Sequence, residues 1–505
     1  MKKSFTGKVA KVLAVSSVAA LMSCAGSAPS NEPNVPVVES SSSETPAEIA
    51  PEVAPTSSET SVDSSSSEEV GVETPAVESS SSDQTAEAVA PAEKSVESSV
   101  GTAVETAAAE PTPADSLASE VQQPVQASED ATVPVAATPD TVRTQVSFFA
   151  IGDVLFHASL YEECAKDSTK CNYDRVFRAW KQDIESADFA AVNQETIFVP
   201  RSEGYTSYPT FGTPTQVGDA EIAAGFDIVT HATNHTIDRK DKNVDFTLDF
   251  WKSKGDASPI VLGIHGTEDD QKTIRYAEKN GIKFAFLNNT YGLNGQKMPA
   301  NRQYLVDMQD SAGNWLKPIA EADANADVVV VFMHVGTEYV PIPSKDAQEK
   351  VAKAIDAGAD IVVCAHPHVV EPYGTLTTKN GNTGLVYWSL GNFISNQTKT
   401  PTLLGGVAKF IVEKTTVGEE SSFAVTSAVF EGSVTHIDEE GHRAIPLKDY
   451  TPEMVKKHHN KKAADLKAIQ QLYKDALQDF SKCGSAQASE KMYMPISRLS
   501  GKVAK

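Results

Sequence analysis

The chain has 505 residues, a length typical of about three domains, and a formal net charge of −24. Most of that charge lies in residues 25–142, which carry 22 Asp or Glu against one Lys, whereas residues 143–505 carry a net charge of only −7. No basic excess is available to neutralise phosphates, which excludes nucleic-acid binding as the main function.

The N-terminus has the features of an export signal. Four lysines within the first 11 residues are followed by an apolar stretch at 12–22, VLAVSSVAALM, which is too short for a transmembrane helix of about 20 residues. The sequence LMSC at 21–24 resembles a bacterial lipobox and predicts a lipoprotein signal peptide over residues 1–24, with lipidation of Cys24. A plain secretory signal cleaved nearby is the alternative. Ala25, which is not an Asp-type retention signal, mildly favours the outer membrane of the cell envelope where two membranes exist.

Residues 25–143 form an acidic linker rich in Ser, Pro, Glu and Ala. The segment contains three runs of four serines and 13 of the 27 prolines, and it has no Phe, Tyr or Trp. Such a segment cannot bury enough apolar surface to offset its chain entropy, so we expect it to be disordered. A random coil of this length spans about 60 Å, which suits a tether between the lipid anchor and a folded domain.

The five cysteines fit an exported protein. Cys164 and Cys171 flank a polar loop and predict a small disulfide in an oxidising compartment, although Cys483 is an alternative partner for either. Cys364 lies in an apolar strand pattern and is expected to be a buried thiol. No CxxC pair occurs, which excludes a zinc ribbon or a thioredoxin-like site.

The sequence pattern of residues 144–450 predicts one α/β domain. Apolar strands are expected at 146–156, 188–195, 282–289, 326–336 and 385–393, the first ending in a turn at Gly152-Asp153. Amphipathic helical stretches at 173–186, 244–255 and within 346–368 alternate with them, and 406–414 with 423–432 resemble an antiparallel pair. This alternation is typical of sheets covered on both faces. Residues 451–505 are expected to form one helix, about 462–480, and a flexible basic tail.

Metal-competent side chains follow the strands of this domain. In such folds ligands bind at the carboxyl ends of strands, and these ends carry Asp153, Glu195, Asn234, His235, His334, His366 and His368. A single histidine there is usually an ordinary hydrogen-bonded residue, but five such strand ends are hard to explain by chance. Carboxylate, imidazole and amide together suit Mn, Fe or Zn better than Ca or Mg. The other histidines are expected in loops or surface patterns, as non-ligands: His265, His436, His442, His458 and His459.

Six short motifs occur in order along this domain. They are GD at 152–153, NQE at 193–195, TNHTID at 233–238, HVGTEY at 334–339, AHPHVVEPY at 365–373 and SLGNF at 389–393. Together they resemble the CapA family of bacterial poly-γ-glutamate capsule synthesis proteins, which is similar to calcineurin-like metallophosphoesterases. The resemblance covers about residues 146–447 and implies a sandwich of two mixed sheets flanked by helices, with a site for two divalent metal ions.

The resemblance also implies roles for single residues. The implied metal ligands are Asp153, Glu195 in place of a bridging Asp, Asn234, His334, His366 and His368. His366 and His368, two apart in an extended segment, would point the same way. His235 would contact the developing charge of the substrate, and Asp238 would either fix His235 or cap the following helix. Two ions about 3.5–4 Å apart would generate hydroxide at neutral pH and clamp the attacked oxygens.

A further set is expected to line the substrate pocket or support the ligands: His157, Glu338, Tyr339, Glu371 and Asn392. The usual Asp-x-His motif becomes DVLFH here, so His157 lies two positions late for a ligand. Glu371 would orient a histidine. Asn392 would either hold a turn under the site or contact the substrate.

Two functions from different classes fit these features. The first is a lipid-anchored dinuclear metallohydrolase that cleaves phosphoester or amide bonds in an envelope polymer or its precursor. The second is a non-catalytic assembly or transport factor that retains a metal site and binds polymer. In both cases the expected partners are the bacterial membrane, polymer-synthesis membrane proteins and an anionic polymer.

Overall fold

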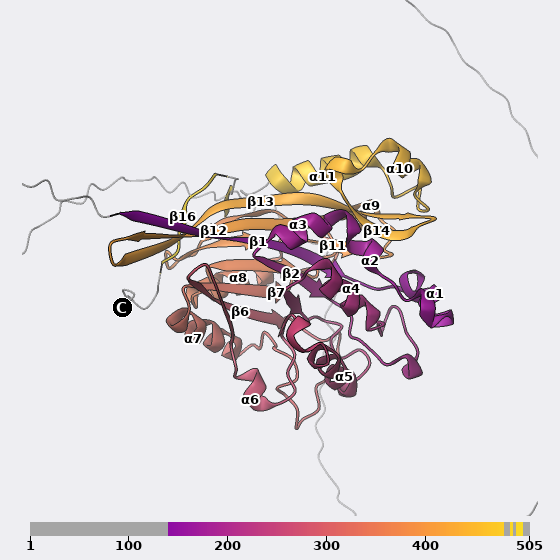
Figure 1. Ribbon diagram of the computed structural model, residues 1–505, viewed down its shortest axis with the longest axis horizontal. Coiled ribbons are helices and arrows are strands. Elements are labelled where there is room, and N and C mark those ends of the chain that lie inside the picture. Colours follow the sequence, from indigo (N-terminus) through magenta and orange to yellow (C-terminus); the bar gives the residue numbers. More distant parts are fainter. Residues whose placement is uncertain (1–139, 479–484, 488–490, 498–505) are drawn as a thin grey trace, which may run out of the picture. The chain divides into compact units, whose positions relative to one another are not determined.

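The computed structural model describes residues 140–478, 485–487 and 491–497. The expected signal peptide, the lipidation site Cys24, the linker as far as residue 139 and Cys483 lie outside the described residues. The described chain forms two mixed β-sheets that pack face to face, with helices on their outer faces (Figure 1). The two-sheet α/β sandwich predicted from the sequence is therefore confirmed.

The first sheet has nine strands among the described residues, in the order β14-β13-β12-β1-β2-β3-β4, with β11 beside β1 and β16 beside β13. Strands β1 to β4 are parallel, and β12 to β14 form an antiparallel meander next to β1. The strand bounds are β1 Thr141–Val154, β2 Phe189–Gln194, β3 Ile228–Thr230, β4 Ile260–Leu262, β11 Asn392–Ile394, β12 Leu404–Val417, β13 Glu420–Asp438, β14 Gly441–Pro446 and β16 Met494–Pro495.

The second sheet has seven strands among the described residues, in the order β15-β9-β10-β8-β7-β6-β5. Its central strands β6, β7, β8 and β10 are parallel. The bounds are β5 Arg275–Lys279, β6 Ile282–Thr290, β7 Val328–His334, β8 Ile361–Ala365, β9 Tyr373–Thr377, β10 Thr383–Tyr387 and β15 Ser485–Gln487.

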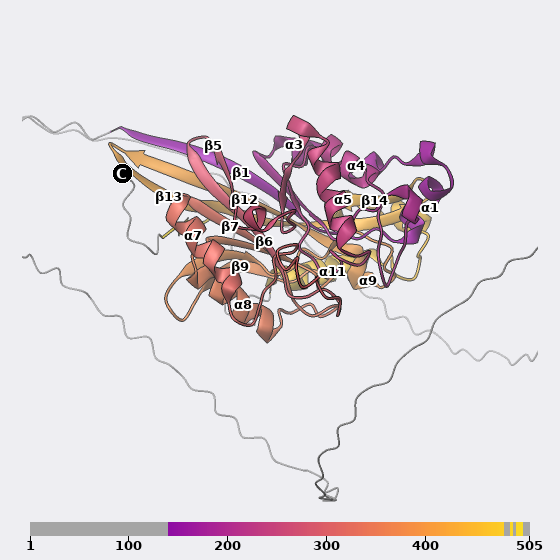
Figure 2. The ribbon, with the colours of Figure 1, turned by 90° about the horizontal axis from the view of Figure 1, so that it is seen from below.

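Helices cover the outer face of each sheet. Figure 2 shows α3, α4 and α5 on one side of the molecule and α7 and α8 on the other. Val217 of α4 and Trp251 of α5 pack on the first sheet, and Ile319 of α7 and Val351 of α8 pack on the second. The helix bounds are α1 Ala158–Lys166, α2 Asp174–Phe177, α3 Lys181–Ser186, α4 Gln216–Ala224, α5 Asp241–Lys252, α6 Glu268–Gln271, α7 Lys317–Asn325, α8 Lys345–Asp356, α9 Thr400–Leu403, α10 Pro452–Lys457 and α11 Leu466–Gln478.

Sequence patterns explain the local structure of the second sheet. Strand β7 has the sequence VVVVFMH and is buried at every position, as expected for a β-branched strand covered on both faces. Helix α8 begins after Ser344, whose hydroxyl oxygen accepts a hydrogen bond from the Ala347 amide at 3.1 Å. Between the sheets, Phe148 of β1 stacks on Phe410 of β12 at 4.5 Å and meets Phe284 of β6 edge-on at 5.1 Å, which closes the core.

The expected turn at Gly152-Asp153 is wrong, because β1 continues through both residues to Val154. A Cβ at Gly152 would lie only 2.0 Å from the Gly391 carbonyl oxygen. The Asp153 amide donates a hydrogen bond to that same oxygen at 2.9 Å. Glycine is needed here so that the chain before β11 can approach β1, and this approach fixes the strand that carries Asp153.

The C-terminal segment also differs from the separate helix and tail expected at 451–505. Ile469 and Ala476 of α11 belong to the core between the sheets, and the Tyr473 hydroxyl donates to the Phe430 carbonyl oxygen at 2.7 Å. Strand β16 pairs with β13, and β15 pairs with β9. The apolar face of α11 is therefore part of the domain.

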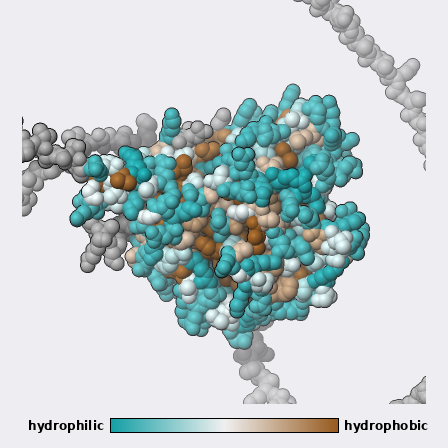
Figure 3. All heavy atoms as spheres, viewed as in Figure 1, coloured by the Kyte–Doolittle hydropathy of each residue, from teal (hydrophilic) through white to brown (hydrophobic). Residues whose placement is uncertain are grey.

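The expectation that the remaining histidines lie in loops or surface patterns is wrong for two of the five. His436 and His442 lie on strands, and they are buried together with His265 and His458, whereas His459 is half-exposed. From the direction of Figure 1 the surface is mostly hydrophilic, with scattered hydrophobic patches (Figure 3). Among the described residues, no helix has both the length and the apolar character that a membrane span requires.

Candidate metal centre

The strand ends of both sheets converge on one site. From the first sheet come Asp153 on β1, Glu195 directly after β2, and Asn234 and His235 in the loop after β3. From the second sheet come His334, the last residue of β7, and His366 and His368 directly after β8. The parallel strands present their carboxyl ends at the same edge of the sandwich, so residues up to 215 positions apart make contact.

Two groups of metal-competent side chains share one carboxylate. Asp153, Glu195 and His368 form one group, and Glu195, His334 and His366 form the other. Within each group the candidate ligand atoms lie within 4.8 Å of one another, and every member is buried. Glu195 therefore occupies the position of a bridging ligand between two adjacent sites.

The carboxylate of Glu195 is buried without protein partners. Both of its oxygens lack a hydrogen bond within the described part of the chain, and the side chain is 0% exposed. Its Oε1 lies 3.7 Å from His368 Nε2, 3.8 Å from His334 Nε2 and 4.0 Å from His235 Nε2. These separations exceed hydrogen-bond length, but two ligand atoms that share a cation at about 2.1 Å are up to about 4.2 Å apart. The side chains thus fit bound divalent metal ions.

The pKa shifts at the site also favour bound cations. Burial, followed by the nearby Asp153, raises the pKa of Glu195 well above its ordinary value, although His368 opposes the shift. Burial lowers the pKa of His366 to about 3 and that of His334 well below its ordinary value, so both imidazoles are neutral, as metal ligation requires. Burial alone would lower the pKa of His368, but Glu195 and Asp153 raise it to about 9. Cations at this position would remove the cost of the buried carboxylates.

The two histidines of the HPH segment have strained backbone conformations. His366 has a φ of 107° and His368 a φ of 60°, so the extended segment expected here is wrong. Non-glycine residues in this region cost about 1–3 kcal/mol each and are held only where the surrounding structure demands it. The two rings lie 5.9 Å apart, centroid to centroid, and each joins one of the Glu195 groups.

Asparagines hold Asp153 and His368 in position. His368 Nδ1 lies 3.1 Å from Asp153 Oδ2 and 3.0 Å from Asn392 Oδ1; since both are acceptors, Nδ1 carries the proton and Nε2 faces Glu195. Asn392 thus supports His368, and its amide nitrogen donates to Gln397 Oε1 and the Thr402 carbonyl oxygen. It is a positioning residue beneath the site.

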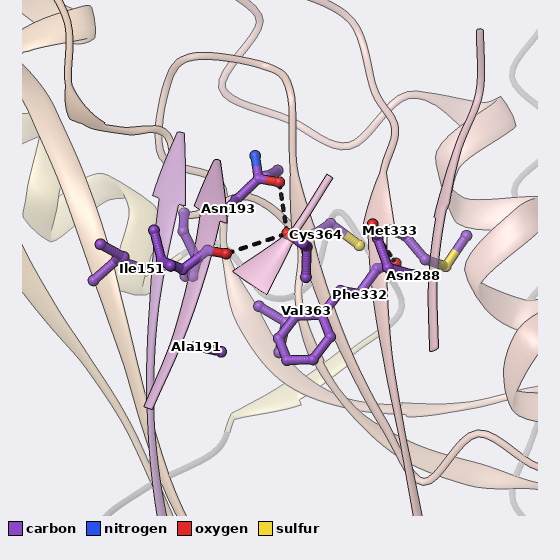
Figure 4. A pocket seen from close by; sticks show the side chains of 12 residues that line it. Ile151, Ala191, Asn193, Asn288, Phe332, Met333, Val363 and Cys364 are labelled. Atoms are coloured by element: carbon purple, nitrogen blue, oxygen red, sulfur yellow. Dashed lines mark hydrogen bonds between the residues drawn. The ribbon is translucent and has the colours of Figure 1, made fainter. Parts of the chain in front are cut away.

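Asn193 holds Asp153 in position, as Asn392 holds His368. Its amide nitrogen donates to Asp153 Oδ1 at 2.8 Å, and its Oδ1 accepts from the Thr230 hydroxyl at 2.8 Å. Figure 4 shows Asn193 beside a cavity of about 10 Å³ between the sheets, with Ile151, Phe332 and Cys364 among its lining residues. The cavity is close to the smallest volume that holds one water. Asn193 lies in the NQE motif only two residues before Glu195, but the motif alone does not indicate a role for it.

His235 is oriented by Asp238. His235 Nδ1 and Asp238 Oδ2 are 2.6 Å apart, and Oδ2 also accepts from the Phe211 amide at 2.7 Å. Of the two roles left open for Asp238, the structure shows contact with His235, because α5 starts after Lys240 with no side-chain cap. The carboxylate holds the proton on Nδ1 and directs Nε2 towards Glu195.

Asn234 lies against His334. Its Oδ1 is 2.9 Å from His334 Nε2, and its amide nitrogen donates to Asn294 Oδ1 at 3.2 Å. The Asn294 amide nitrogen also lies 3.4 Å from the ring nitrogens of His235. Asn294 was missed, because it stands in the loop after β6 and belongs to no motif.

The other expected pocket residues lie at different depths. His157 bonds through Nδ1 to the Leu155 carbonyl oxygen at 3.1 Å and belongs to neither Glu195 group; burial lowers its pKa to about 4. Glu338 and Tyr339 are exposed beside His368. Glu371 is buried with Oε1 lacking a partner among the described residues, and no described hydrogen bond joins it to a histidine.

The structure joins Cys164 and Cys171 in a disulfide, with Cα atoms 4.5 Å apart, at the end of α1. Cys364 is a buried thiol on β8.

The fold and the site define a class of protein: an α/β sandwich of two mixed sheets with a candidate metal centre at its strand ends. The model of a protein family, "Bacterial capsule synthesis protein PGA_cap", matches residues 147–397. Together with two curated relatives, this match confirms the resemblance to CapA proteins.

Two curated relatives carry related names. The chain is 33% identical over 195 residues to the "PGA biosynthesis protein CapA" of Bacillus subtilis (strain 168), covering 38% of this chain and 49% of that protein. It is 28% identical over 319 residues to the "Capsule biosynthesis protein CapA" of Bacillus anthracis, covering 59% of this chain and 74% of that protein. The match thus spans about half the length of the first relative and three quarters of the second.

A solved structure of a "Putative 5'-Nucleotidase from Staphylococcus aureus in complex with alpha-ketoglutarate" is also similar. The two chains are 17% identical, with a TM-score of 0.37, and the alignment covers 66% of this chain and 58% of that one. At this level the similarity supports no inference about function.

Proposed function

We propose that the protein is an envelope-anchored, CapA-like protein of capsule or poly-γ-glutamate synthesis or export, with a dinuclear metal hydrolase site that acts on phosphoester or polymer amide bonds. One observation carries the proposal: the buried, unpartnered carboxylate of Glu195 is shared by two groups of candidate ligands. A carboxylate in that position is costly unless cations compensate it. The names of the relatives support a role in capsule polymer synthesis.

Two sets of residues would each hold one metal ion, and His235 would act on the substrate. Asp153, Glu195 and His368 would hold one ion, and Glu195, His334, His366 and Asn234 the other. Two divalent ions, of which Mn, Fe or Zn suit these ligands best, would activate water at neutral pH and neutralise charge on the attacked group. His235 would donate a hydrogen bond or a proton from Nε2 towards the developing charge, with Asp238 holding its Nδ1 proton.

The envelope location rests on the sequence alone. Lipidation of Cys24 would anchor the chain, and the acidic linker would let the domain reach substrate at a distance from the membrane. The proposed partners are the bacterial membrane, polymer-synthesis membrane proteins and the anionic polymer.

A second candidate function is metal-dependent polymer binding without turnover in assembly or transport. The position of His157 favours it, because the first motif supplies no imidazole to either Glu195 group and the His157 ring bonds to the backbone instead. Glu at position 195, where metallophosphoesterases carry Asp, also departs from the usual hydrolase pattern.

The discriminating experiment compares Mn-loaded and chelator-treated protein. Both are incubated with a panel of phosphodiesters and with poly-γ-glutamate, and product release and polymer length are measured. The proposal predicts metal-dependent cleavage that His235→Ala strongly reduces. Metal-bound protein that binds polymer and cleaves nothing in the panel would reject the hydrolase in favour of the binding factor.

A further inference from the structure

The solvent side of the metal centre carries a further acidic side chain, Glu338, besides the buried Asp153 and Glu195. It stands in the segment 335–344, between β7 and α8, and is exposed. One of its carboxylate oxygens nevertheless lies within 4.8 Å of ligand nitrogens of both His366 and His368. His366 belongs to one Glu195 group and His368 to the other, so Glu338 faces both ion positions.

The backbone ties Glu338 to these histidines. The amide of the next residue, Tyr339, donates to the Pro367 carbonyl oxygen at 2.8 Å. Gly336 has a φ of +136°, and a Cβ there would lie 2.7 Å from Pro367 Cγ. Pro367 separates the two ligand histidines, so the segment that carries Glu338 packs directly on the segment that carries them.

The carboxylates of Glu195 and Glu338 lie in different environments. Glu195 is fully buried beneath the ligands, where water cannot replace it, whereas Glu338 reaches the same histidines from the solvent side. A carboxylate is a hard anionic oxygen donor, as are phosphate and carboxylate groups of a substrate. Such groups would approach the ions from the open side and compete with Glu338 for the same coordination positions.

We propose that Glu338 is an additional, exchangeable ligand of the metal centre, which covers both ions from solvent and is displaced by an anionic oxygen of the substrate. The inference rests on the proposed metal site and extends it. It assigns the substrate an anionic group that binds at the metals, and it gives Glu338 the role of a ligand that leaves when this group arrives.

The test uses the full-length protein, the variant Glu338→Gln and the matched control Glu349→Gln. Glu349 is exposed on α8, and its substitution removes the same charge outside the ligand groups. Calorimetry measures Mn²⁺ affinity and then the affinity of the Mn-loaded protein for inorganic phosphate. We expect Glu338→Gln to bind Mn²⁺ about 10-fold or more weakly and phosphate several-fold more tightly, with Glu349→Gln like wild type.

A shorter side chain gives a second variant. Glu338→Asp keeps the carboxylate but reduces its reach, so its Mn²⁺ affinity should lie between those of Glu338→Gln and wild type. Thermal unfolding of the chelator-treated variants checks folding, which the exposed position of Glu338 predicts to be unchanged.

Mn²⁺ affinity in Glu338→Gln within twofold of wild type would overturn the inference. Unchanged phosphate affinity in Glu338→Gln would overturn the proposal that the substrate displaces Glu338. These failures are distinct from failure of the proposed function: wild type that binds no Mn²⁺ rejects the metal centre itself. Wild type that binds Mn²⁺ and shows the Glu338 effect without any turnover rejects the hydrolase and supports the ligand role.

Discussion

Replacing Glu195 with glutamine is expected to change the free energy of unfolding in opposite directions with and without metal. In the metal-free protein the buried carboxyl has a raised pKa, so wild type loses stability as pH rises above the ordinary pKa of 4.5. The loss is about 1.4 kcal/mol for each pH unit over which the native carboxyl stays protonated. Glutamine does not titrate, so the metal-free variant should be the more stable protein at pH 7.

With bound metal, Glu195→Gln is expected to lower the free energy of unfolding instead of raising it. Glu195 belongs to both ligand groups, so Glu195→Gln removes the charge of a shared ligand from two ions at once. Loss of a supporting residue typically weakens metal affinity 10–100-fold, and loss of a direct ligand should reach about 100-fold or more, or ~2.7 kcal/mol per ion. Asn392→Ala, which removes only a support of His368, should weaken metal binding less than Glu195→Gln.

Urea unfolding at pH 7, with chelator and with saturating Mn²⁺, measures both effects. Glu221→Gln is the matched control: Glu221 on α4 is a fully buried carboxyl whose two oxygens also lack partners among the described residues, and burial raises its pKa. Without metal, Glu221→Gln should be more stable than wild type, as is expected of Glu195→Gln. Its metal binding should be unchanged. Equal Mn²⁺ content in Glu195→Gln and wild type would show that Glu195 is not a metal ligand.

Three further predictions follow from other features. His235→Ala should keep its metal, since it removes no member of either ligand group, and should lower turnover about 10²–10⁴-fold; metal loss measured by elemental analysis would contradict this. The pKa of His442 is lowered by burial from 6.5 to about 3, so unfolded chains bind an extra proton between these pH values and acid destabilises the fold. In chelator, His442→Gln should reduce the slope of unfolding free energy against pH by up to about 1.4 kcal/mol per unit below pH 6.5, and an unchanged slope would count against it. Cys24→Ala should shift the protein from the membrane fraction to the soluble fraction, whereas wild-type partitioning of the variant would reject the lipid anchor.

The candidate site was largely predictable, because its residues follow apolar runs. Buried parallel strands are recognised by their composition, and their carboxyl ends share an edge, so Asp153, Glu195 and His334 could be placed together from the sequence. Asn193 and Asn294 could not, because asparagines serve many structural purposes and their partners come from other strands and loops. The positive φ angles of the HPH segment are imposed by packing around the site, which local sequence does not encode.

Burial away from the site was less predictable. His436 lies on β13, where it bonds Asp438 at 3.1 Å and packs against His458 at a ring distance of 5.2 Å. Its burial depends on the C-terminal segment returning to cover that sheet. The amphipathic pattern of α11 predicted a helix, but where its apolar face docks is decided by long-range contacts such as that of Tyr473 with Phe430.

In the proposed metal centre, Glu195 bridges two metal ions. Anomalous X-ray diffraction from crystals of the Mn-loaded protein tests it most directly, because it locates each ion independently of any assay. We expect two anomalous peaks about 3.5–4 Å apart, with Glu195 in contact with both. A single peak, or two peaks of which only one contacts Glu195, would contradict it.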